Sequence, residues 1–427
     1  MKVNSASATL IILCAFALLL AEDETTIIYP PFKHTWGIHK GTEAKLDMLL
    51  DDRTDFDNPQ GIAVTRLRSW DDPKSKTDDD EITAFGVNSN RGEIIYNSSM
   101  YSLALFGKRG SGRGEFSNPH GICATEDGDV YVADTDNRRI VHLHIGKKKL
   151  RWIKSFGENF FKKPFDVKAV PGGTLYVSDN ELDSIFVVDT SGTLIKKIGG
   201  LFAPRGLDVD SKNYRWSAYK QNFIAVVDSS GKRIVMLDRL SGKIIHRKNF
   251  YELNMPDADL QYVAIDYLDN IYITDSVRCQ IHKFDRKLNY LTSMFKCGME
   301  EYRLDHPRGI DIWRRFGQII VAERASAQYF WVAVDVKNLK IDFDRESEKI
   351  ILSLFVTEEA YITAEINGKG IEQKLGRKRR IDSGQQKVEF DLPPGLESGK
   401  YRIKITVEPT YSSKKYFKKE YERKIKI

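Results

Sequence analysis

The stretch NPHGICATEDGDVYVADTDNRRIVHL, from Asn118 to Leu143, decides the fold. It contains a turn of the form Asn-Pro-x-Gly, a short apolar run, a polar turn and two further apolar runs, VYVAD and RIVHL. β-Branched and aromatic residues favour strands, whereas Gly, Asp and Asn favour the turns between them. The stretch therefore predicts antiparallel strands joined by short turns.

The same order of turn and strands occurs six times along the chain, at intervals of roughly 40 to 60 residues. One four-stranded sheet cannot bury both of its faces, but six sheets packed around an axis can. The repeats therefore predict an all-β fold with a six-bladed β-propeller over residues 32–336. Their first strands begin in NPQGIAV at Asn58, NPHGICA at Asn118, KPFDVKAV at Lys163, APRGLDV at Ala203, DLQYVAI at Asp259 and HPRGIDI at His306.

The Asn-Pro-His-Gly turn and the run VADTDNRRI (Val132–Ile140) resemble the NHL repeat, a family whose repeats form six-bladed propellers. The resemblance extends from Phe32 to Val336, and it is weakest in the fifth repeat. The sixth repeat supplies only three strands, while FKHTWGIHKG (Phe32–Gly41) precedes the first repeat as LALFG precedes the second. We therefore expect this early segment to be the outer strand of the last blade and to close the ring.

Residues 337–427 have a different pattern, in which short runs alternate apolar and polar residues between Gly- and Pro-rich turns. This pattern predicts a small β-sandwich. VKNLKI and ESGKYRIKI resemble the Ig-like module of flagellar hook-capping proteins. The segment holds 21 basic and 15 acidic residues, so the entire net charge of +6 belongs to it. Its basic runs, 376–380 and 414–426, are either solvated strand faces or a docking surface for an anionic cell envelope.

Residues 1–21 are expected to be a secretory signal, because Lys2 precedes the continuous apolar run Ala8–Ala21. That run is too short for a typical membrane span. An uncleaved anchor and lipid attachment at Cys14 are the alternatives. The expected location is therefore secreted, periplasmic or in the cell envelope, where disulfides persist. Cys279 and Cys297 flank a predicted hairpin and would face each other, either bonded or as free thiols, whereas Cys123 is expected to be a buried thiol.

The propeller mouth is the predicted ligand site. In NHL propellers the turn before the first strand and the turn after the second strand open on one face, so the variable residue of Asn-Pro-x-Gly would line the mouth. This rule selects Gln60, His120, Phe165, Arg205, Gln261 and Arg308. The residues that end the second strands would join them, namely Asp134, Asp179, Asp228, Asp275 and Glu323, with Asn97 in the first repeat. The alternative for these acidic residues is that they cap their own turns.

Such a mouth could bind an anionic or peptide-like ligand through Arg205 and Arg308. We expect a non-enzymatic binding protein without cofactor or metal, with a protein or peptide partner and no nucleic acid. Some related propellers are zinc-dependent lyases or metal-dependent lactonases, but a zinc site needs three or four converging ligands and only His120 is available at these positions. A metal-dependent lyase or hydrolase with His120 as a ligand is the first alternative function, and a structural spacer is the second.

Overall fold

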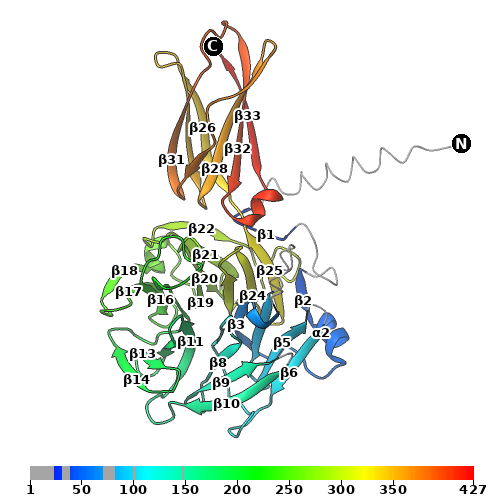
Figure 1. Ribbon diagram of the computed structural model, residues 1–427, viewed down its shortest axis with the longest axis vertical. Helices are drawn as coiled ribbons and strands as arrows, with labels where there is room; N and C mark the ends of the chain where they lie inside the picture. Colours follow the sequence, from blue (N-terminus) through cyan, green and yellow to red (C-terminus); the bar gives the residue numbers. More distant parts are fainter. Residues whose placement is uncertain (1–23, 31–38, 71–81, 100–101, 147–148) are drawn as a thin grey trace, which may run out of the picture. The chain divides into compact units, whose positions relative to one another are not determined.

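The computed structural model describes residues 24–30, 39–70, 82–99, 102–146 and 149–427 (Figure 1). The predicted signal segment 1–21 and most of the predicted closing strand lie outside these ranges. The chain divides into two compact units, one formed by Tyr29–Trp331 and one by Val332–Ile427 together with the residues up to Ile28. Strands dominate both units, so the predicted all-β class is confirmed.

The first unit contains six antiparallel sheets that follow one another along the chain. In the first five, four strands lie in sequence order. These strands are β3 (Pro59–Thr65), β4 (Thr83–Asn88), β5 (Glu93–Ser99) and β6 (Ser102–Gly107); β7 (Ile122–Ala124), β8 (Asp129–Asp134), β9 (Arg139–Ile145) and β10 (Leu150–Phe156); β11 (Pro164–Val170), β12 (Thr174–Asp179), β13 (Ser184–Asp189) and β14 (Leu194–Ile198); β15 (Leu207–Val209), β16 (Phe223–Asp228), β17 (Arg233–Asp238) and β18 (Ile244–Asn249); and β19 (Leu260–Ile265), β20 (Ile271–Asp275), β21 (Gln280–Phe284) and β22 (Tyr290–Met294).

The sixth sheet joins the two ends of the first unit. It includes β23 (Ile310–Trp313), β24 (Gln318–Ala322) and β25 (Ser326–Val332), and β25 pairs with β2 (Lys40–Thr42) from the start of the unit. The register places Lys40 opposite Gln328. The last sheet is therefore completed by a strand that comes from before the first repeat.

The first strand of each sheet contacts the first strand of the next, and β23 of the last sheet contacts β3 of the first. The sheets thus surround a common axis, which is the arrangement of a β-propeller (Figure 1). At four of the six junctions the repeat glycine donates its backbone N–H to a carbonyl oxygen of the adjacent first strand, at 2.8–3.2 Å. The four bonds run from Gly61 to His120, from Gly121 to Phe165, from Gly206 to Gln261 and from Gly309 to Gln60.

These glycines are required by the close approach of the sheets. A Cβ atom at Gly309 would lie 2.4 Å from the carbonyl oxygen of Gln60. The third and fifth repeats carry Asp166 and Tyr262 at the glycine position. There a hydroxyl from the second strand makes the link instead, because Ser178 donates to the Arg205 carbonyl at 2.7 Å and Thr274 to the Arg308 carbonyl at 2.5 Å. The departures from the repeat are therefore compensated within the same sheets.

The helix α2 (Glu43–Leu50) was not predicted from the sequence. It follows β2 directly and buries Leu46 and Leu50. The described connections also contain three short 3₁₀ turns: η1 (Arg68–Trp70), η2 (Phe250–Leu253) and η3 (Ser412–Lys415). None of the helices among the described residues is long and apolar enough to cross a membrane.

The hairpin expected between the two paired cysteines is formed by β21 and β22. Cys279 and Cys297 are joined by a disulfide, with their Cα atoms 4.9 Å apart. Cys123 is a free, buried thiol. Burial raises its pKa to about 12, so it is unreactive as a nucleophile at neutral pH.

The second unit consists of two antiparallel sheets around one apolar core. Alternate residues of β27 are buried, namely Ile350, Leu352, Leu354 and Val356, as the sequence pattern requires. The N-terminal segment belongs to this unit, since Ala333 donates its N–H to the Thr26 carbonyl just before β1 (Ile27–Ile28). One sheet contains β26 (Val336–Asp344), β27 (Lys349–Val356) and β31 (Gly384–Asp391), and the other contains β28 (Ala360–Gly368), β29 (Ile371–Lys374), β30 (Arg379–Ile381), β32 (Lys400–Pro409) and β33 (Lys419–Lys426).

Candidate functional site: the mouth of the propeller

The variable residues of the six repeat turns meet at one pocket of about 280 Å³, which we call the mouth. All six residues selected by the repeat rule line it: Gln60, His120, Phe165, Arg205, Gln261 and Arg308. Each sits immediately before or at the start of the first strand of its sheet. The radial packing of the sheets therefore converts six positions far apart in the sequence into one surface.

The turns that carry these residues have an unusual backbone. In four repeats the residue before the proline has a positive φ, with Asn58 at 56°, Asn118 at 49°, Ala203 at 43° and His306 at 48°. Asn tolerates this left-handed conformation better than most residues, which explains its place in the first two repeats. The turn directs the following residues toward the axis.

Three cations lie at the mouth. Lys163 is exposed, and Arg205 pairs with Asp259 at 2.6 Å while also donating to the Leu260 carbonyl. Arg308 has a buried Nε with no hydrogen-bond acceptor among the described residues. None of the described residues that line the mouth is acidic. The mouth is therefore suited to accept an anionic group.

An aromatic run forms part of the same surface. The rings of His120 and Phe165 have centroids 4.9 Å apart, and those of Phe165 and Tyr262 lie 5.4 Å apart. The His120 Nδ1 is within 2.9 Å of the Asn118 carbonyl and 3.0 Å of the Thr135 hydroxyl. Burial lowers the pKa of His120 to about 4, and the nearby Lys163 and Arg308 act in the same direction. The ring is therefore neutral at physiological pH.

The acidic residues predicted to join the mouth do not line it, and that prediction is wrong. Asp134, Asp179, Asp228, Asp275 and Glu323 are fully buried. They accept hydrogen bonds from neighbouring turns: Asp179, for example, accepts the backbone N–H groups of Lys162, Glu181 and Leu182. Asn97 is likewise occupied by the backbone of Ile82 and Ala84. These side chains cap turns, as the alternative interpretation held.

Four mouth residues were missed: Asn118, Lys163, Asn180 and Ser230. Asn118 and Lys163 precede the variable residue by two positions. Asn180 and Ser230 follow the strand-ending aspartates by one and two positions. The repeat alignment contained this signal, because each of these three positions recurs in every repeat.

Below the mouth, the first strands carry a second charged group, which we call the axial cluster: Lys168, Asp208, Asp311 and Arg314. Lys168 lies 2.8 Å from Asp311 and 3.8 Å from Asp208, and Arg314 lies 3.2 Å from Asp208. Arg314 also contacts Asp210 at 3.1 Å. Burial alone would lower the pKa of Lys168, but Asp208 and Asp311 outweigh it and hold that pKa above its usual value. The cluster is therefore charged and internally paired.

Three aspartates near the axis also bond adjacent first strands together. Asp166 accepts the N–H of Leu207, Asp208 accepts that of Ile265, and Asp311 accepts that of Val64. The cost of burying Asp166 raises its pKa to about 7. These bonds make the axial aspartates part of the scaffold.

The described residues contain no group of three or more His, Cys, Asp or Glu side chains arranged to hold a metal ion. His142 and His144, which stand on one face of β9, both contact Asp129, at 2.9 and 3.1 Å. They lie on the third strand of their sheet, away from the mouth. His120, the proposed ligand in the lyase alternative, has Phe165 as its ring neighbour.

Comparison with known proteins gives one family match. Residues 116–143 match the NHL repeat, which confirms the resemblance noted in the Asn118–Leu143 stretch. The chain is 28% identical over 162 residues to Protein brain tumor of Drosophila melanogaster, covering 36% of this chain and 14% of that protein. It thus spans a small part of that relative's length.

Solved structures with a similar chain path include two enzymes. One is virginiamycin B lyase from Staphylococcus aureus, with 13% identity, a TM-score of 0.41 and coverage of 58% of this chain and 76% of the other. The other is a gluconolactonase from Xanthomonas campestris, with 12% identity, a TM-score of 0.46 and coverage of 71% and 97%. The sheet arrangement and the repeat match together identify the first unit as a β-propeller that contains an NHL repeat.

Proposed function

We propose that this chain is an exported, non-enzymatic binding protein, built as a six-bladed NHL propeller followed by an Ig-like module. Its mouth binds an acidic segment of a partner protein. The observation that carries this proposal is the lining of the mouth, where Lys163, Arg205 and Arg308 meet amide and aromatic side chains and no acidic residue among those that the structure describes. Charge-assisted hydrogen bonds from arginine to a carboxylate are stronger than neutral ones and suit such a ligand.

The lining favours binding over catalysis. In the part of the chain that the structure describes, the lining has one imidazole, which is neutral and lies against Phe165, and no carboxylate or thiol that could act as general base or nucleophile. A metal-dependent reaction at the mouth would require ligands beyond His120. Metal analysis of the purified protein tests this alternative, because a stoichiometric divalent ion would replace the binding proposal.

The test uses a fluorescent octaglutamate peptide and the full-length protein. Arg308→Gln should weaken binding about tenfold, which corresponds to about 1.4 kcal/mol, because it removes a cation with a buried, unpartnered Nε. Arg324→Gln is the control, since Arg324 is exposed, pairs with Asp305 and is not part of the lining. Equal peptide affinity in wild type and Arg308→Gln would refute the proposal. Tighter binding of a single-stranded oligonucleotide of equal charge would assign the mouth to nucleic acid instead.

The Ig-like module is the proposed docking element for an anionic envelope surface. Several of its basic residues already pair with acidic neighbours, such as Lys378 with Glu408, Lys404 with Glu420 and Arg380 with Glu359. Such ion pairs weaken the positive electrostatic field with which the module would attract an anionic surface. Binding to anionic vesicles that survives replacement of Lys414 and Lys415 by Gln would exclude this run as the contact.

A further inference from the structure

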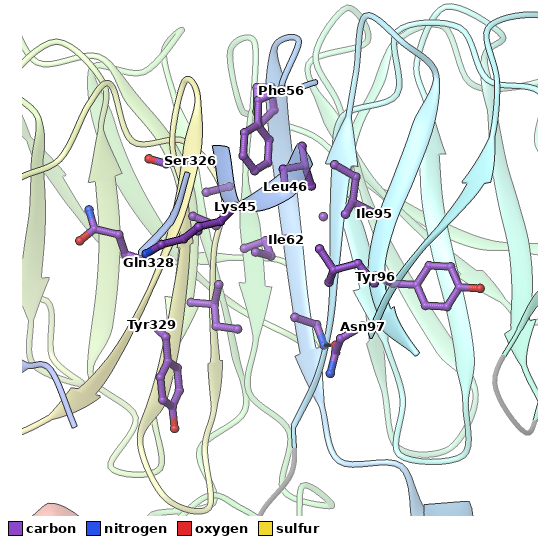
Figure 2. Close-up of a pocket in the computed structure, with 18 of the residues that line it drawn as sticks. Lys45, Leu46, Phe56, Ile62, Ile95, Tyr96, Asn97, Ser326, Gln328 and Tyr329 are labelled. Atoms are coloured by element: carbon purple, nitrogen blue, oxygen red, sulfur yellow. Dashed lines mark hydrogen bonds between the residues drawn. The ribbon is translucent and has the colours of Figure 1, made fainter. Parts of the chain in front are cut away.

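An apolar cavity of about 300 Å³ lies between the last and the first sheets of the propeller, separate from the mouth (Figure 2). Its walls come from β24 and β25 on one side and from β3, β4 and β5 on the other, and α2 contributes Lys45, Leu46 and Leu49. None of its lining residues lines the mouth. The cavity therefore belongs to the junction where the ring closes.

The cavity is open because several lining residues are small. Gly41, Ala84, Gly86, Ala322 and Ala327 stand where larger side chains would fill the space. A Cβ atom added at Gly86 would meet only the Ile95 carbonyl oxygen, at an ordinary 3.9 Å. The remaining wall is mainly aliphatic and aromatic, with Leu46, Leu49, Phe56, Ile62, Ile82, Val87, Ile95, Leu103 and Ile320. An apolar cavity of this size is poorly hydrated and accepts an apolar ligand.

One buried polar atom in the wall lacks a partner. His39 is 9% exposed, and its Nε2 has no hydrogen-bond partner among the described residues. The ring is held in place by stacking on Tyr29, with centroids 4.5 Å apart. A buried nitrogen without a hydrogen-bond partner destabilises a protein. The presence of such a nitrogen in the cavity wall therefore points to a ligand group that hydrogen-bonds to it.

A cation stands near the same end of the cavity. The Lys45 Nζ donates to the carbonyl oxygen of Lys40, the residue next to His39, at 2.7 Å. Figure 2 shows the Lys45 side chain extending from α2 toward the Gln328 side of the cavity. An ammonium group has three N–H donors, so Lys45 has donors to spare. Among the described residues, none that lines the cavity is Asp or Glu.

The other amides of the lining are already engaged. Asn97 bonds the backbone of Ile82 and Ala84, Asn88 donates to the Asp55 carbonyl, and Gln328 donates to the Arg303 carbonyl. Among the nitrogen-bearing side chains of the lining, recognition of a ligand's polar group therefore falls to His39 and Lys45. Both can donate a hydrogen bond, and neither faces an acidic residue of the lining.

We propose that this cavity binds a small amphipathic carboxylic acid, such as a medium-chain fatty acid, with its chain among the aliphatic residues and its carboxylate on Lys45 and the His39 Nε2. At about 30 Å³ for each water-sized group, the cavity holds roughly ten such groups, which is comparable to the ten heavy atoms of octanoate. The anionic head follows from the unopposed cation and donor. This site is independent of the proposed function of the mouth.

Calorimetric titration of the full-length protein with octanoate and with neutral octanol tests the proposal. Octanoate should bind at least tenfold more tightly than octanol. Lys45→Met should remove that preference while leaving octanol affinity unchanged. Lys108→Met is the control, because Lys108 is exposed and outside the lining. Absence of octanoate binding at millimolar concentration, or an undiminished preference in Lys45→Met, would overturn the proposal.

Two further variants keep the test decisive if Lys45→Met does not fold. Gly86→Val should fill the cavity and abolish binding of both ligands without a fall in melting temperature. His39→Phe retains an aromatic ring against Tyr29, so it should raise the melting temperature of the free protein and lower octanoate affinity. Arg308→Gln should leave octanoate binding unchanged, which separates this site from the mouth.

Discussion

The mouth and the axial cluster are formed at positions three residues apart along the same repeats, yet their charged side chains differ in how completely they are paired. Arg308 lies at the mouth with an unpartnered Nε, whereas Asp311, three residues later, pairs with Lys168 and accepts the Val64 N–H. Buried charges are retained in proteins when they are paired and hydrogen-bonded. The axial charges are therefore paired within the ring, whereas the Arg308 Nε at the mouth has no partner among the described residues, as the proposed binding role requires.

The largest expected effect comes from breaking the axial cluster. Lys168→Met would leave Asp311 without its cation at 2.8 Å, in a buried site. Loss of one partner from a buried ion pair typically destabilises a protein by about 3–5 kcal/mol. Chemical denaturation should show this loss for Lys168→Met but a change within about 0.5 kcal/mol for Lys163→Met at the exposed mouth. Similar losses in both variants would remove the distinction between the two regions.

A smaller effect is expected from the glycine that follows Arg308. In Gly309→Ala the added Cβ would lie 2.4 Å from the Gln60 carbonyl oxygen, so the adjacent sheets must move apart. Overpacking of this kind costs about 1–3 kcal/mol. Because the shift occurs at the mouth, peptide affinity should fall together with stability. Gly199→Ala is the control, since its nearest contact would be the Ser184 hydroxyl at 3.9 Å, and an unchanged melting temperature in Gly309→Ala would contradict the close junction.

The smallest effect is a pH dependence that differs between the two regions. Burial raises the pKa of Asp166 to about 7, so the native state binds this proton more tightly than the unfolded state does. Its contribution to stability is therefore full below the unfolded pKa of about 4 and is lost as the pH rises through 7. His120 behaves in the opposite way, since its lowered pKa of about 4 removes stability as the pH falls from 6.5 toward 4.

Asp166→Asn isolates the axial part of this behaviour. The variant should gain about 1 kcal/mol relative to wild type between pH 6 and pH 7, because it cannot lose the proton that wild type loses. Denaturation midpoints at the two pH values measure the gain. The same difference between variant and wild type at both pH values would show that Asp166 is already ionised at pH 6.

Much of the mouth could be predicted from the sequence, because the variable position of the repeat turn is periodic and the propeller places all its copies around one axis. The axial cluster could also have been predicted from the sequence, because three of its residues occupy one fixed position of the repeat. Lys168, Asp208 and Asp311 each stand three residues after the variable residue of their repeats, where the other repeats have Ala63, Cys123 and Ala264. The same alignment, followed three residues further, would have revealed the cluster.

Other features could not be predicted from the repeats. The strand-ending acidic residues were wrongly placed at the mouth because a periodic carboxylate looks the same in sequence whether it faces a ligand or caps a turn. The cavity depends on α2, on His39 and on small residues from both ends of the propeller, none of which recurs. Its existence follows from the tertiary packing at the closing junction.

The pairing of β2 with β25 also imposes a delay during protein synthesis, because the two strands are made at different times. Lys40 leaves the ribosome about 290 residues before its partner Gln328. At about 5–20 residues per second, this strand waits on the order of 15–60 s with an unpaired edge. Exposed strand edges invite pairing with other chains. Translation speed and chaperone protection of this early strand are therefore expected to govern the yield of closed rings.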